Sequence, residues 1–270
     1  MALAIDHDGP ITLLEFDHGK ANEMGSAQLD ALEGLCDDLV ARGARALISH
    51  SRRKSDKGTP IYISGADVTE RRGWSDERVA AHVRRQRAVL TRLRHLPLLH
   101  ITVVNGVALG WGTEFLITAD YRIALPEATF GLPETGLGII PGAGGSSELW
   151  SLIGLPQAIR LGMTGERIDA AEAARIGLVQ ELQPDHGAGL ARARALADAT
   201  AKRSPTAVAA FKAAALAAVG RPAAERQAIE AAAYEHCLFG GEAAIGRAHF
   251  KAIISGEGAP WGPLRVFGGE

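Results

Sequence analysis

The sequence has little cysteine, no strong excess of either charge and no long apolar run. Its two cysteines, Cys36 and Cys237, are too few for a disulfide framework or a metal cluster, which favours a reducing compartment. The formal net charge of −2 leaves no broad basic surface for nucleic acid. No stretch approaches the roughly 20 apolar residues that cross a membrane, and the N-terminus MALAIDHDGP lacks the features of a secretory signal. We therefore expect a cytoplasmic protein without a membrane partner.

What is present is enough apolar sequence for a full core. With 270 residues and 47% hydrophobic content, the chain can form one large domain or one domain with an appendage. Apolar periodicity and turn signals predict strands and helices in the first part, then alanine-rich helices after Gly187. The predicted strands are 11–16, 46–49, 61–64, 100–104 and 179–182, and the longer predicted helices are 26–44, 75–95, 188–202, 205–219, 223–238 and 241–254.

The stretch from His100 to Gly145 places two acids, Glu114 and Glu134, among residues that normally lie inside a protein. A buried carboxylate is costly unless it is paired or used. Glycine-rich turns beside both acids allow backbone N–H groups to approach a ligand closely. The combination favours a site where protons move while backbone amides hold a developing negative charge. Taken singly, Glu114 reads more readily as a partly exposed helix residue and Glu134 as a loop residue, and only the glycine pattern and the spacing favour catalysis.

Four ordered motifs carry a stronger signal. They are VNGVALGWGTE (104–114), ADYRIA (119–124), FGLPE (130–134) and LGIIPGAGG (137–145). Together they resemble the enoyl-CoA hydratase/isomerase (crotonase) family. The resemblance implies an α/β fold with a crotonase-like ββα spiral core over residues 1–186. It also implies a helical region over 187–270 that covers the active site and builds a homotrimer or a dimer of trimers.

The same resemblance implies a reaction on an acyl-CoA thioester. Two backbone N–H groups, those of Ala66 and Trp111, would hold the thioester oxygen, and Glu114 and Glu134 would handle the water and the proton. Substrate contacts are implied at Lys20, Ala21, Asn22, Ser64, Gly65, Ala66, Asp67, Gly110, Trp111 and Gly142. No separate cofactor is implied, because coenzyme A enters as part of the substrate, and no histidine, cysteine or acid set has metal-ligand spacing.

Several basic groups are alternatives for the coenzyme phosphates. Residues 20–22 read equally well as an ordinary polar turn. The loop 50–60 is basic and longer than a tight connection needs, although such charges more often form a solvated surface. Thr69 stands where relatives commonly have a lysine. Lys57, Arg71 or Arg72 would then have to meet the phosphates instead.

Scaffolds of this family support several reactions, so function is less determined than fold. We expect an acyl-CoA hydro-lyase with Glu114 acting on the water and Glu134 on the α-carbon. An enoyl-CoA isomerase, for which one glutamate suffices, is the nearest alternative. The arginines of helix 75–95 leave a binding member, including an RNA binder, as a third reading, though solvated helix faces are commoner.

Trp111 is the main departure from the family pattern, which has small residues at this position. If the indole faces the acyl pocket, it shortens or flattens that pocket and favours small or planar acyl groups. If the indole packs outward, it changes nothing. The first case predicts that a Trp111→Gly variant accepts longer chains. The Gly/Pro-rich end, 256–270, also departs from the family and is expected to be a packed or subunit-crossing tail.

Overall fold

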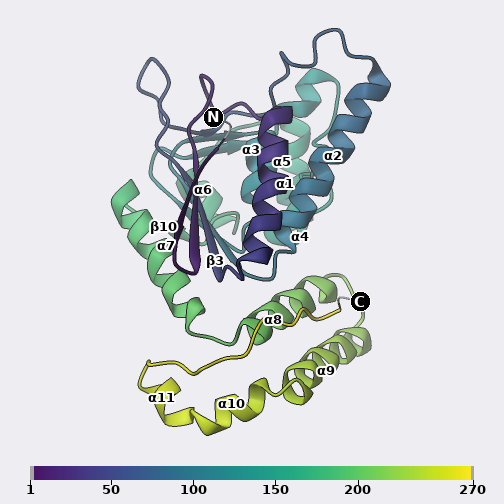
Figure 1. The fold of residues 1–270 in the computed structure, drawn as a ribbon. Helices are drawn as coiled ribbons and strands as arrows, with labels where there is room; N and C mark the ends of the chain where they lie inside the picture. The colour runs from purple at the N-terminus through teal and green to yellow at the C-terminus, as the bar shows by residue number, and fades with distance from the viewer. Residues whose placement is uncertain (1–2, 269–270) are drawn as a thin grey trace.

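Two β-sheets form the centre of the computed structural model, which describes residues 3–268 (Figure 1). The larger sheet has the strand order β1-β2-β3-β5-β7-β10, and the smaller sheet has the order β4-β6-β8-β9. Neighbouring strands are parallel except for β1 with β2 and β8 with β9. The strands are β1 (Ala4–Asp8), β2 (Ile11–Phe16), β3 (Ala46–Ser51), β4 (Ile61–Ile63), β5 (Leu99–Val104), β6 (Val107–Leu109), β7 (Tyr121–Ala124), β8 (Thr129–Gly131), β9 (Ile168–Asp169) and β10 (Glu181–Leu182).

The chain winds as a repeating spiral. In each repeat one strand joins the larger sheet, the next strand joins the smaller sheet, and a helix follows. The repeats are β3-β4-α2, β5-β6-α3 and β7-β8-η1. The helices are α1 (Ser26–Ala41), α2 (Asp76–Arg94), α3 (Trp111–Leu116), the 3₁₀ helix η1 (Pro133–Leu137), α4 (Leu149–Ile153), α5 (Leu155–Thr164), α6 (Ala170–Arg175), α7 (His186–Ala201), α8 (Pro205–Ala218), α9 (Ala223–Phe239), α10 (Glu242–Ala248) and α11 (Phe250–Ile254). This arrangement confirms the predicted α/β class and its ββα repeat.

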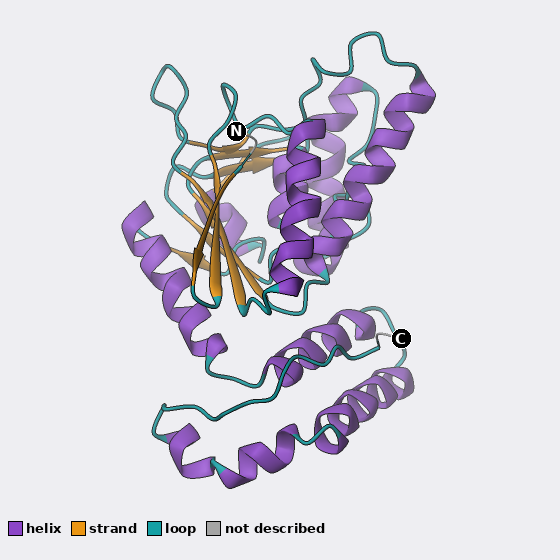
Figure 2. Ribbon diagram, in the orientation of Figure 1, coloured by secondary structure: helices purple, strands orange, loops and turns teal. Residues whose placement is uncertain are grey.

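Helices cover the larger sheet on both faces (Figure 2). The apolar stripes of α1 and α2 pack with α3 into one buried cluster, and α7 packs on the other face through Ala193 and Ala197. The apolar repeat of 26–44 predicts an inward stripe that includes Val40; its leucines are buried, but Val40 is 47% exposed because it lies beyond the edge of that stripe. The repeat of 75–95 predicts Val79, Val83, Leu90 and Leu93 inward; the two leucines are buried, whereas the two valines are only half-buried and His82 and Gln86 complete the buried stripe.

The sequence prediction found the longer elements and missed the shorter ones. Strand β2 has the predicted bounds 11–16, and β10 lies at the edge of the larger sheet as expected. Strands β1, β6, β7, β8 and β9 were not predicted. The predicted helix 241–254 is two helices, α10 and α11, which meet at His249. Among the described residues no helix is long and apolar enough to cross a membrane.

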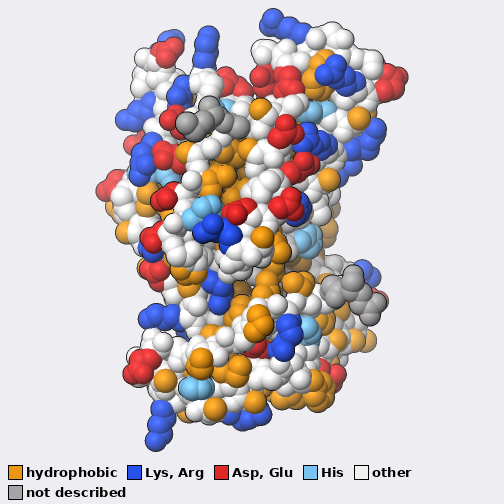
Figure 3. All heavy atoms as spheres, in the orientation of Figure 1, with side chains coloured by type: hydrophobic (Ala, Val, Ile, Leu, Met, Phe, Trp, Pro, Cys, Tyr) orange, Lys and Arg blue, Asp and Glu red, His pale blue; other side chains and the backbone are white. Residues whose placement is uncertain are grey.

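The last helices form a separate layer below the sheets, which we call the C-terminal lobe (α8 to α11, residues 205–254). Figure 3 shows hydrophobic side chains gathered over it, and Phe211, Phe239 and Ile254 are each at least 70% exposed. Helix α7, by contrast, lies against the sheet. The boundary predicted between residues 186 and 187 thus falls at the start of a helix that packs on the sheet. The first predicted region begins and the second ends in residues 1–2 and 269–270, which lie outside the described residues.

The described part of the C-terminal tail packs back onto its own chain. The indole Nε1 of Trp261 donates a hydrogen bond to the carbonyl of Lys202 at 2.9 Å, and the amide of Arg265 donates to Thr206 Oγ1 at 3.0 Å. A carboxylate of the buried Glu242 accepts a hydrogen bond from Ser204, the residue that caps α8. The first two bonds tie the tail to the junction between α7 and α8, so Trp261 and Arg265 contact their own chain, in line with one of the two arrangements expected for the tail.

Candidate active site

The turn after β4 presents one free backbone amide. On either side of Ala66 the backbone is engaged, because Ser64 N–H donates to Ala21 O at 3.1 Å and Asp67 N–H donates to Met24 O at 2.8 Å. The amide of Ala66 donates to no described residue. Gly65 has φ +138°, a conformation that a side chain disfavours, and it turns the next peptide out of the strand direction. Ala66 therefore offers an unused N–H donor at a fixed position.

The start of α3 presents a second free backbone amide, that of Trp111. Trp111 is the first residue of this helix, whose first-turn amides have no partner within the helix. Its N–H donates to no acceptor in the part of the chain that the structure describes. Gly110, which precedes it, has φ +52° and ψ −118°, so the chain enters the helix through a turn that favours glycine. The positive end of the helix backbone lies at this amide.

Gly112 brings these two amides to the same place. A Cβ atom on Gly112 would lie 2.2 Å from the carbonyl oxygen of Ile63, so only glycine lets α3 approach the end of β4 this closely. Ile63 leads directly into the Gly65–Ala66 turn, and a Cβ on Gly65 would lie 3.5 Å from Leu109 O just before α3. Two unused donors therefore lie on closely packed segments, an arrangement that suits a carbonyl oxygen that becomes negative.

Glu114 lies one turn into α3 and is anchored by backbone amides. Its side chain is 3% exposed, and Oε1 accepts hydrogen bonds from Ala143 N–H at 2.7 Å and Gly145 N–H at 3.0 Å. Burial raises the pKa of Glu114, while the two amides and the charge of Arg87 act in the opposite direction. Oε2 has no hydrogen-bond partner among the described residues and is not sealed from solvent. One oxygen is thus fixed and the other is free to act.

Glu134 occupies the first turn of η1 and has no such anchor. Its Oε2 is buried and makes no hydrogen bond with the described residues. A Cβ on Gly110 would lie 2.6 Å from Glu134 Oε1, so this carboxyl group lies against the turn that carries the Trp111 amide. Burial raises the pKa of Glu134 to about 7, and the charge of Glu114 adds to the rise. Near neutral pH this acid is partly protonated.

The two acids are therefore close but unequal. More of the described groups that stabilise a negative charge act on Glu114, namely two amides and Arg87, whereas Glu134 has only its own backbone amide and is opposed by the charge of Glu114. Burial raises the pKa of both acids, and these partners favour the charge on Glu114 and the proton on Glu134. This is the arrangement that a base and an acid need to act on one substrate.

The other predicted contact residues divide into exposed and structural ones. Lys20 is exposed, and Ala21 pairs with the turn at Ser64. Asn22 is fully buried at φ +55°, and its side chain donates to Phe16 O, Tyr62 O and Ser51 Oγ. The carboxylate of Asp67 accepts from Thr69 and Glu70 and holds the turn after Ala66. The side chains of Asn22 and Asp67 thus shape the backbone of the site.

The indole of Trp111 lies inside the molecule. It is 2% exposed and stacks on Phe115 with ring centroids 5.7 Å apart, in the same buried cluster as α1 and α2. Its Nε1 is buried and has no hydrogen-bond partner among the described residues. The indole does not face solvent, so packing outward, which would leave substrate preference unchanged, is not what the structure has.

Most basic groups near the site already have partners. Arg52 pairs with Glu15 at 3.1 Å and Arg53 with Asp17 at 2.9 Å. Lys57 and Arg72 are exposed, and Arg71 is half-buried with its Nε unpartnered among the described residues. The arginines of α2 are largely engaged as well. Arg85 binds Glu33, Arg92 binds Asp37, Arg94 binds Glu148 and Arg78 lies over Trp74.

Sequence reasoning missed the groups that hold Glu114. The amides of Ala143 and Gly145 were read only as part of a turn that shapes the pocket wall, and Gly142 as a substrate contact. Backbone donors leave no side-chain signature, so only the run of glycines hinted at them. Arg87, whose Nε donates to Gly142 O at 2.8 Å, was read as one of several arginines on a solvated helix face.

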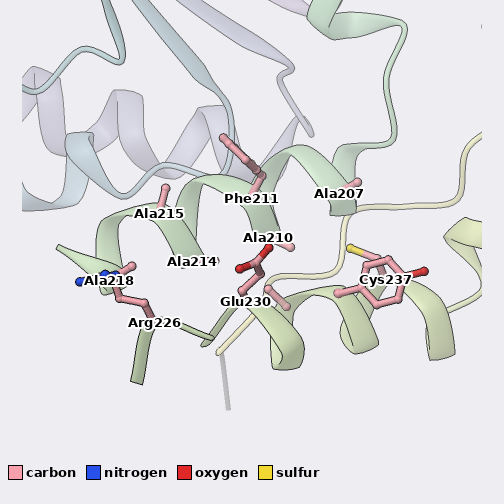
Figure 4. Close-up of a pocket in the computed structure, with 11 residues that line it drawn as sticks. Ala207, Ala210, Phe211, Ala214, Ala215, Ala218, Arg226, Glu230 and Cys237 are labelled. Carbon is pink, nitrogen blue, oxygen red and sulfur yellow. The ribbon is translucent and has the colours of Figure 1, made fainter. Parts of the chain in front are cut away.

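Cavities lie beside the acids and in the lobe. A cavity of about 230 Å³ is lined by Thr135, which follows Glu134, by Gly145, which holds Glu114, and by apolar groups of α4 and α5. A larger cavity of about 490 Å³ lies between α8 and α9, and Figure 4 shows Phe211 on one of its walls and Glu230 on the other. No group of three or more potential metal ligands occurs within residues 3–268.

Comparison with known proteins gives consistent matches. Residues 57–251 match the family model described as Enoyl-CoA hydratase/isomerase. An enoyl-CoA isomerase/hydratase of Zymoseptoria tritici is 37% identical over 205 residues, which cover 72% of this chain and 65% of that protein. The enoyl-CoA hydratase domain-containing protein 2, mitochondrial, of Bos taurus is 35% identical over 214 residues, 77% of this chain and 70% of that protein. The chain thus spans about two thirds of the length of these relatives.

The fold also has a close match among solved structures. The enoyl-CoA hydratase from Bacillus anthracis superposes with a TM-score of 0.87 at 30% sequence identity. The match covers 97% of this chain and 99% of that one, so it includes the C-terminal lobe as well as the sheets.

Proposed function

This chain belongs to the enoyl-CoA hydratase/isomerase family and has the crotonase fold, and we propose that it adds water to, or removes water from, an α,β-unsaturated acyl-CoA thioester. The observation that carries the proposal is the pair of unequal acids beside two unused backbone amides. An anchored, ionisable Glu114 and a buried, protonatable Glu134 supply a base and an acid within one site.

The amides of Ala66 and Trp111 would polarise the thioester. As the oxygen of the thioester carbonyl accepts both hydrogen bonds, negative charge moves onto it and the β-carbon becomes electrophilic. Because the donors are fixed in the backbone, they need no reorganisation as the charge develops. Removal of one such donor in other enzymes lowers the rate by about 10²–10³-fold.

The two acids would then complete the addition. Glu114 carboxylate takes a proton from water as the oxygen of that water forms a bond to the β-carbon. The resulting enolate, held by the two amides, collapses and takes the proton of Glu134 at the α-carbon. One hydroxyl and one hydrogen have been added, and the acids return to their starting states when a proton passes from Glu114 to Glu134 through water.

Isomerisation is the second candidate, because Glu134 alone could carry it out. Its unpartnered Oε2 and pKa of about 7 suit a group that both takes and gives a proton at carbon. A change at Glu114 distinguishes the two activities, because hydration needs this residue and isomerisation does not. If the protein is an isomerase, a Glu114→Gln variant moves the double bond at the wild-type rate, whereas a hydratase loses water addition in that variant.

The direct test is a screen of short, branched and aromatic enoyl-CoAs for loss of the conjugated absorbance. Wild type should consume at least one of them, and Glu134→Gln should be slower by about 10²–10⁴-fold on the same substrate, the usual size of a general acid–base contribution. If no enoyl-CoA loses its absorbance with wild type at micromolar protein, the hydration proposal is wrong.

The substrate would bring its own coenzyme A, and the exposed Lys20, Lys57 and Arg72 together with half-buried Arg71 are the basic groups we propose for its phosphates. A Lys57→Ala/Arg72→Ala double variant should raise KM with little change in kcat, because these groups hold the substrate equally in its ground and transition states. A rise in kcat/KM would contradict this assignment.

We also propose that the protein works as a homotrimer or a dimer of trimers. The exposed apolar side chains of the C-terminal lobe, which include Phe211, Tyr234 and Phe239, support an assembly in which a second copy covers them. Sedimentation velocity would give the mass directly, and a monomer at micromolar concentration would contradict the proposal. The cytoplasmic location is likewise proposed, and since the Bos taurus relative is named as mitochondrial, imaging of a tagged chain is its test.

A further inference from the structure

A continuous line of contacts joins α2 to the carboxylate of Glu114. Arg87 on α2 donates its Nε–H to Gly142 O at 2.8 Å. The two amides that bind Glu114 Oε1, those of Ala143 and Gly145, follow Gly142 in the same turn. Movement of this turn by a fraction of an ångström therefore moves the oxygen that it holds.

The charge of Arg87 acts on the same carboxylate. The positive guanidinium favours the ionised form of Glu114 and so works with the two amides against the effect of burial. The other charged groups around this turn are Glu134, which opposes ionisation of Glu114, and Arg94, which is neutralised by Glu148 at 2.6 Å. Arg87 is thus the cation that acts on Glu114.

The helix that carries Arg87 is itself braced on both sides. A Cβ atom on Gly142 would lie 2.6 Å from Val83 Cγ1, so α2 packs directly on the turn. On its other side, Arg85 binds Glu33 of α1 through two hydrogen bonds. Arg84 lies between these two contacts and is exposed, as Arg87 is, but it has no hydrogen bond or ion pair among the described residues. It carries the same charge on the same helix without the contact to the turn.

We propose that Arg87 is a positioning residue for the base: it fixes the Gly142–Gly145 turn through the carbonyl of Gly142, and with it the carboxylate oxygen of Glu114 that this turn holds. This inference rests on the proposed hydration function, because it gives Glu114 the role of base. Arg87 acts through the turn and through its field, and it does not touch the reacting atoms.

The kinetic test uses Arg87→Ala, Arg87→Lys and, as the matched control, Arg84→Ala. Arg87→Ala should lower kcat about tenfold, since small misplacements of a catalytic group are costly. It should also move the acid limb of the pH–rate profile upward by about half a unit, because loss of a nearby positive charge raises the pKa of a carboxyl group. Arg87→Lys keeps the charge but not the Nε–H geometry, so its acid limb should stay near that of wild type while kcat remains low.

Arg84→Ala removes the same charge and should leave both kcat and the profile unchanged. If Arg84→Ala shifts the acid limb as far as Arg87→Ala does, the effect comes from net charge and the proposal is wrong. Unchanged kcat and an unchanged profile in Arg87→Ala would also overturn it.

A measurement without turnover separates this inference from the proposed function. With ¹³C-labelled glutamate carboxyls, the signal of Glu114, assigned by its loss in Glu114→Gln, is followed through a pH titration by NMR. Its midpoint should rise in Arg87→Ala and stay in place in Arg84→Ala. If wild type hydrates no enoyl-CoA but this shift is seen, the function fails and the role of Arg87 stands. If hydration is seen and the midpoint does not move, the role of Arg87 fails.

Discussion

The two acid-bearing segments of the site are built in opposite ways. Glu114 belongs to a buried frame, β6 and α3, in which every residue of α3 is buried. Glu134 belongs to η1, a 3₁₀ helix with no buried residue at all. Both carboxyl groups are nevertheless largely withdrawn from water. The two acids also differ in their partners, because two backbone amides and a cation favour the charge on Glu114, whereas Glu134 has only its own backbone amide and is opposed by the charge of Glu114.

The largest expected effect comes from removing each acid in turn. Glu134→Gln cannot deliver a proton to carbon and should lower hydration and any isomerisation alike, by about 10²–10⁴-fold. Glu114→Gln should lower hydration by a similar factor but leave proton exchange at the α-carbon. Stopped-flow absorbance measures hydration, and deuterium uptake at the α-carbon of a saturated acyl-CoA measures exchange.

Gln at position 114 retains an oxygen that accepts from Ala143 and Gly145, so the fold should survive and circular dichroism should be unchanged. If both variants lose both activities to the same extent, the acids act as one unit and the division of roles drawn from their partners is incorrect.

A second test compares glycines from the two segments. Gly112→Ala places a Cβ 2.2 Å from the backbone of Ile63, which cannot move without displacing the Ala66 turn. Overpacking of this kind costs about 1–3 kcal/mol, and separating the two amides should lower kcat about 10²-fold. The Cβ added by Gly136→Ala, on η1, meets no atom within 4 Å, so this variant should change neither the stability nor kcat. Thermal melting and kcat on one enoyl-CoA give both readings.

If Gly112→Ala and Gly136→Ala have the same melting temperature and the same kcat, the residues around α3 are packed no more tightly than those of the exposed turn. A Gly112→Ala variant that melts lower but keeps its kcat would instead separate packing from the alignment of the amides, and it would remove the oxyanion role given to Trp111.

The pH dependence of stability tests the unpartnered state of Glu134. Its pKa rises from 4.5 to about 7 on folding, so the folded state binds the proton more tightly. The stability that this provides is complete below pH 4.5 and is lost as the pH rises through 7. Glu134→Gln has no such loss and should exceed wild type by about 1 kcal/mol at pH 8 after allowance for partial exposure. Urea unfolding at pH 5 and pH 8 measures the difference in free energy of unfolding between Glu134→Gln and wild type. The same difference at both pH values would contradict the raised pKa.

Periodicity predicted the elements that are long enough to show it. Strand 11–16 and the helices that became α1, α2, α7, α8 and α9 carry enough apolar repeats to be located within a few residues. Strands β6 and β8 have three residues each and owe their conformation to the parallel ladder they share. A three-residue strand has no period to detect, so of the smaller sheet only β4 was predicted from the sequence pattern.

The residues of the site also divide into those that the sequence predicted and those that it did not. Motifs mark the predicted ones, which are Glu114, Glu134 and the amides of Ala66 and Trp111. The contacts that give the acids unequal partners come from residues that the sequence does not bring together, such as Arg87 on α2 and the turn after Pro141. Asn22 shows the converse, because a motif position read as a ligand contact has its side chain committed to three buried hydrogen bonds.

The smallest expected effect is on acyl specificity, at the junction of the two segments. Trp111 supplies an amide to the site and an indole to the core, where its Nε1 has no partner among the described residues. Trp111→Gly would remove a buried side chain at a cost of about 3–5 kcal/mol, so Trp111→Phe, which keeps the stacking on Phe115, is the gentler variant. If the indole limits the acyl chain, each added methylene that the smaller ring admits should improve the relative kcat/KM by up to about fourfold, the equivalent of 0.8 kcal/mol. Competition between enoyl-CoAs of increasing length measures this preference. A lower melting temperature with an unchanged length preference would show that the indole serves the core alone, and acyl length would then have to be set by the η1 side of the site.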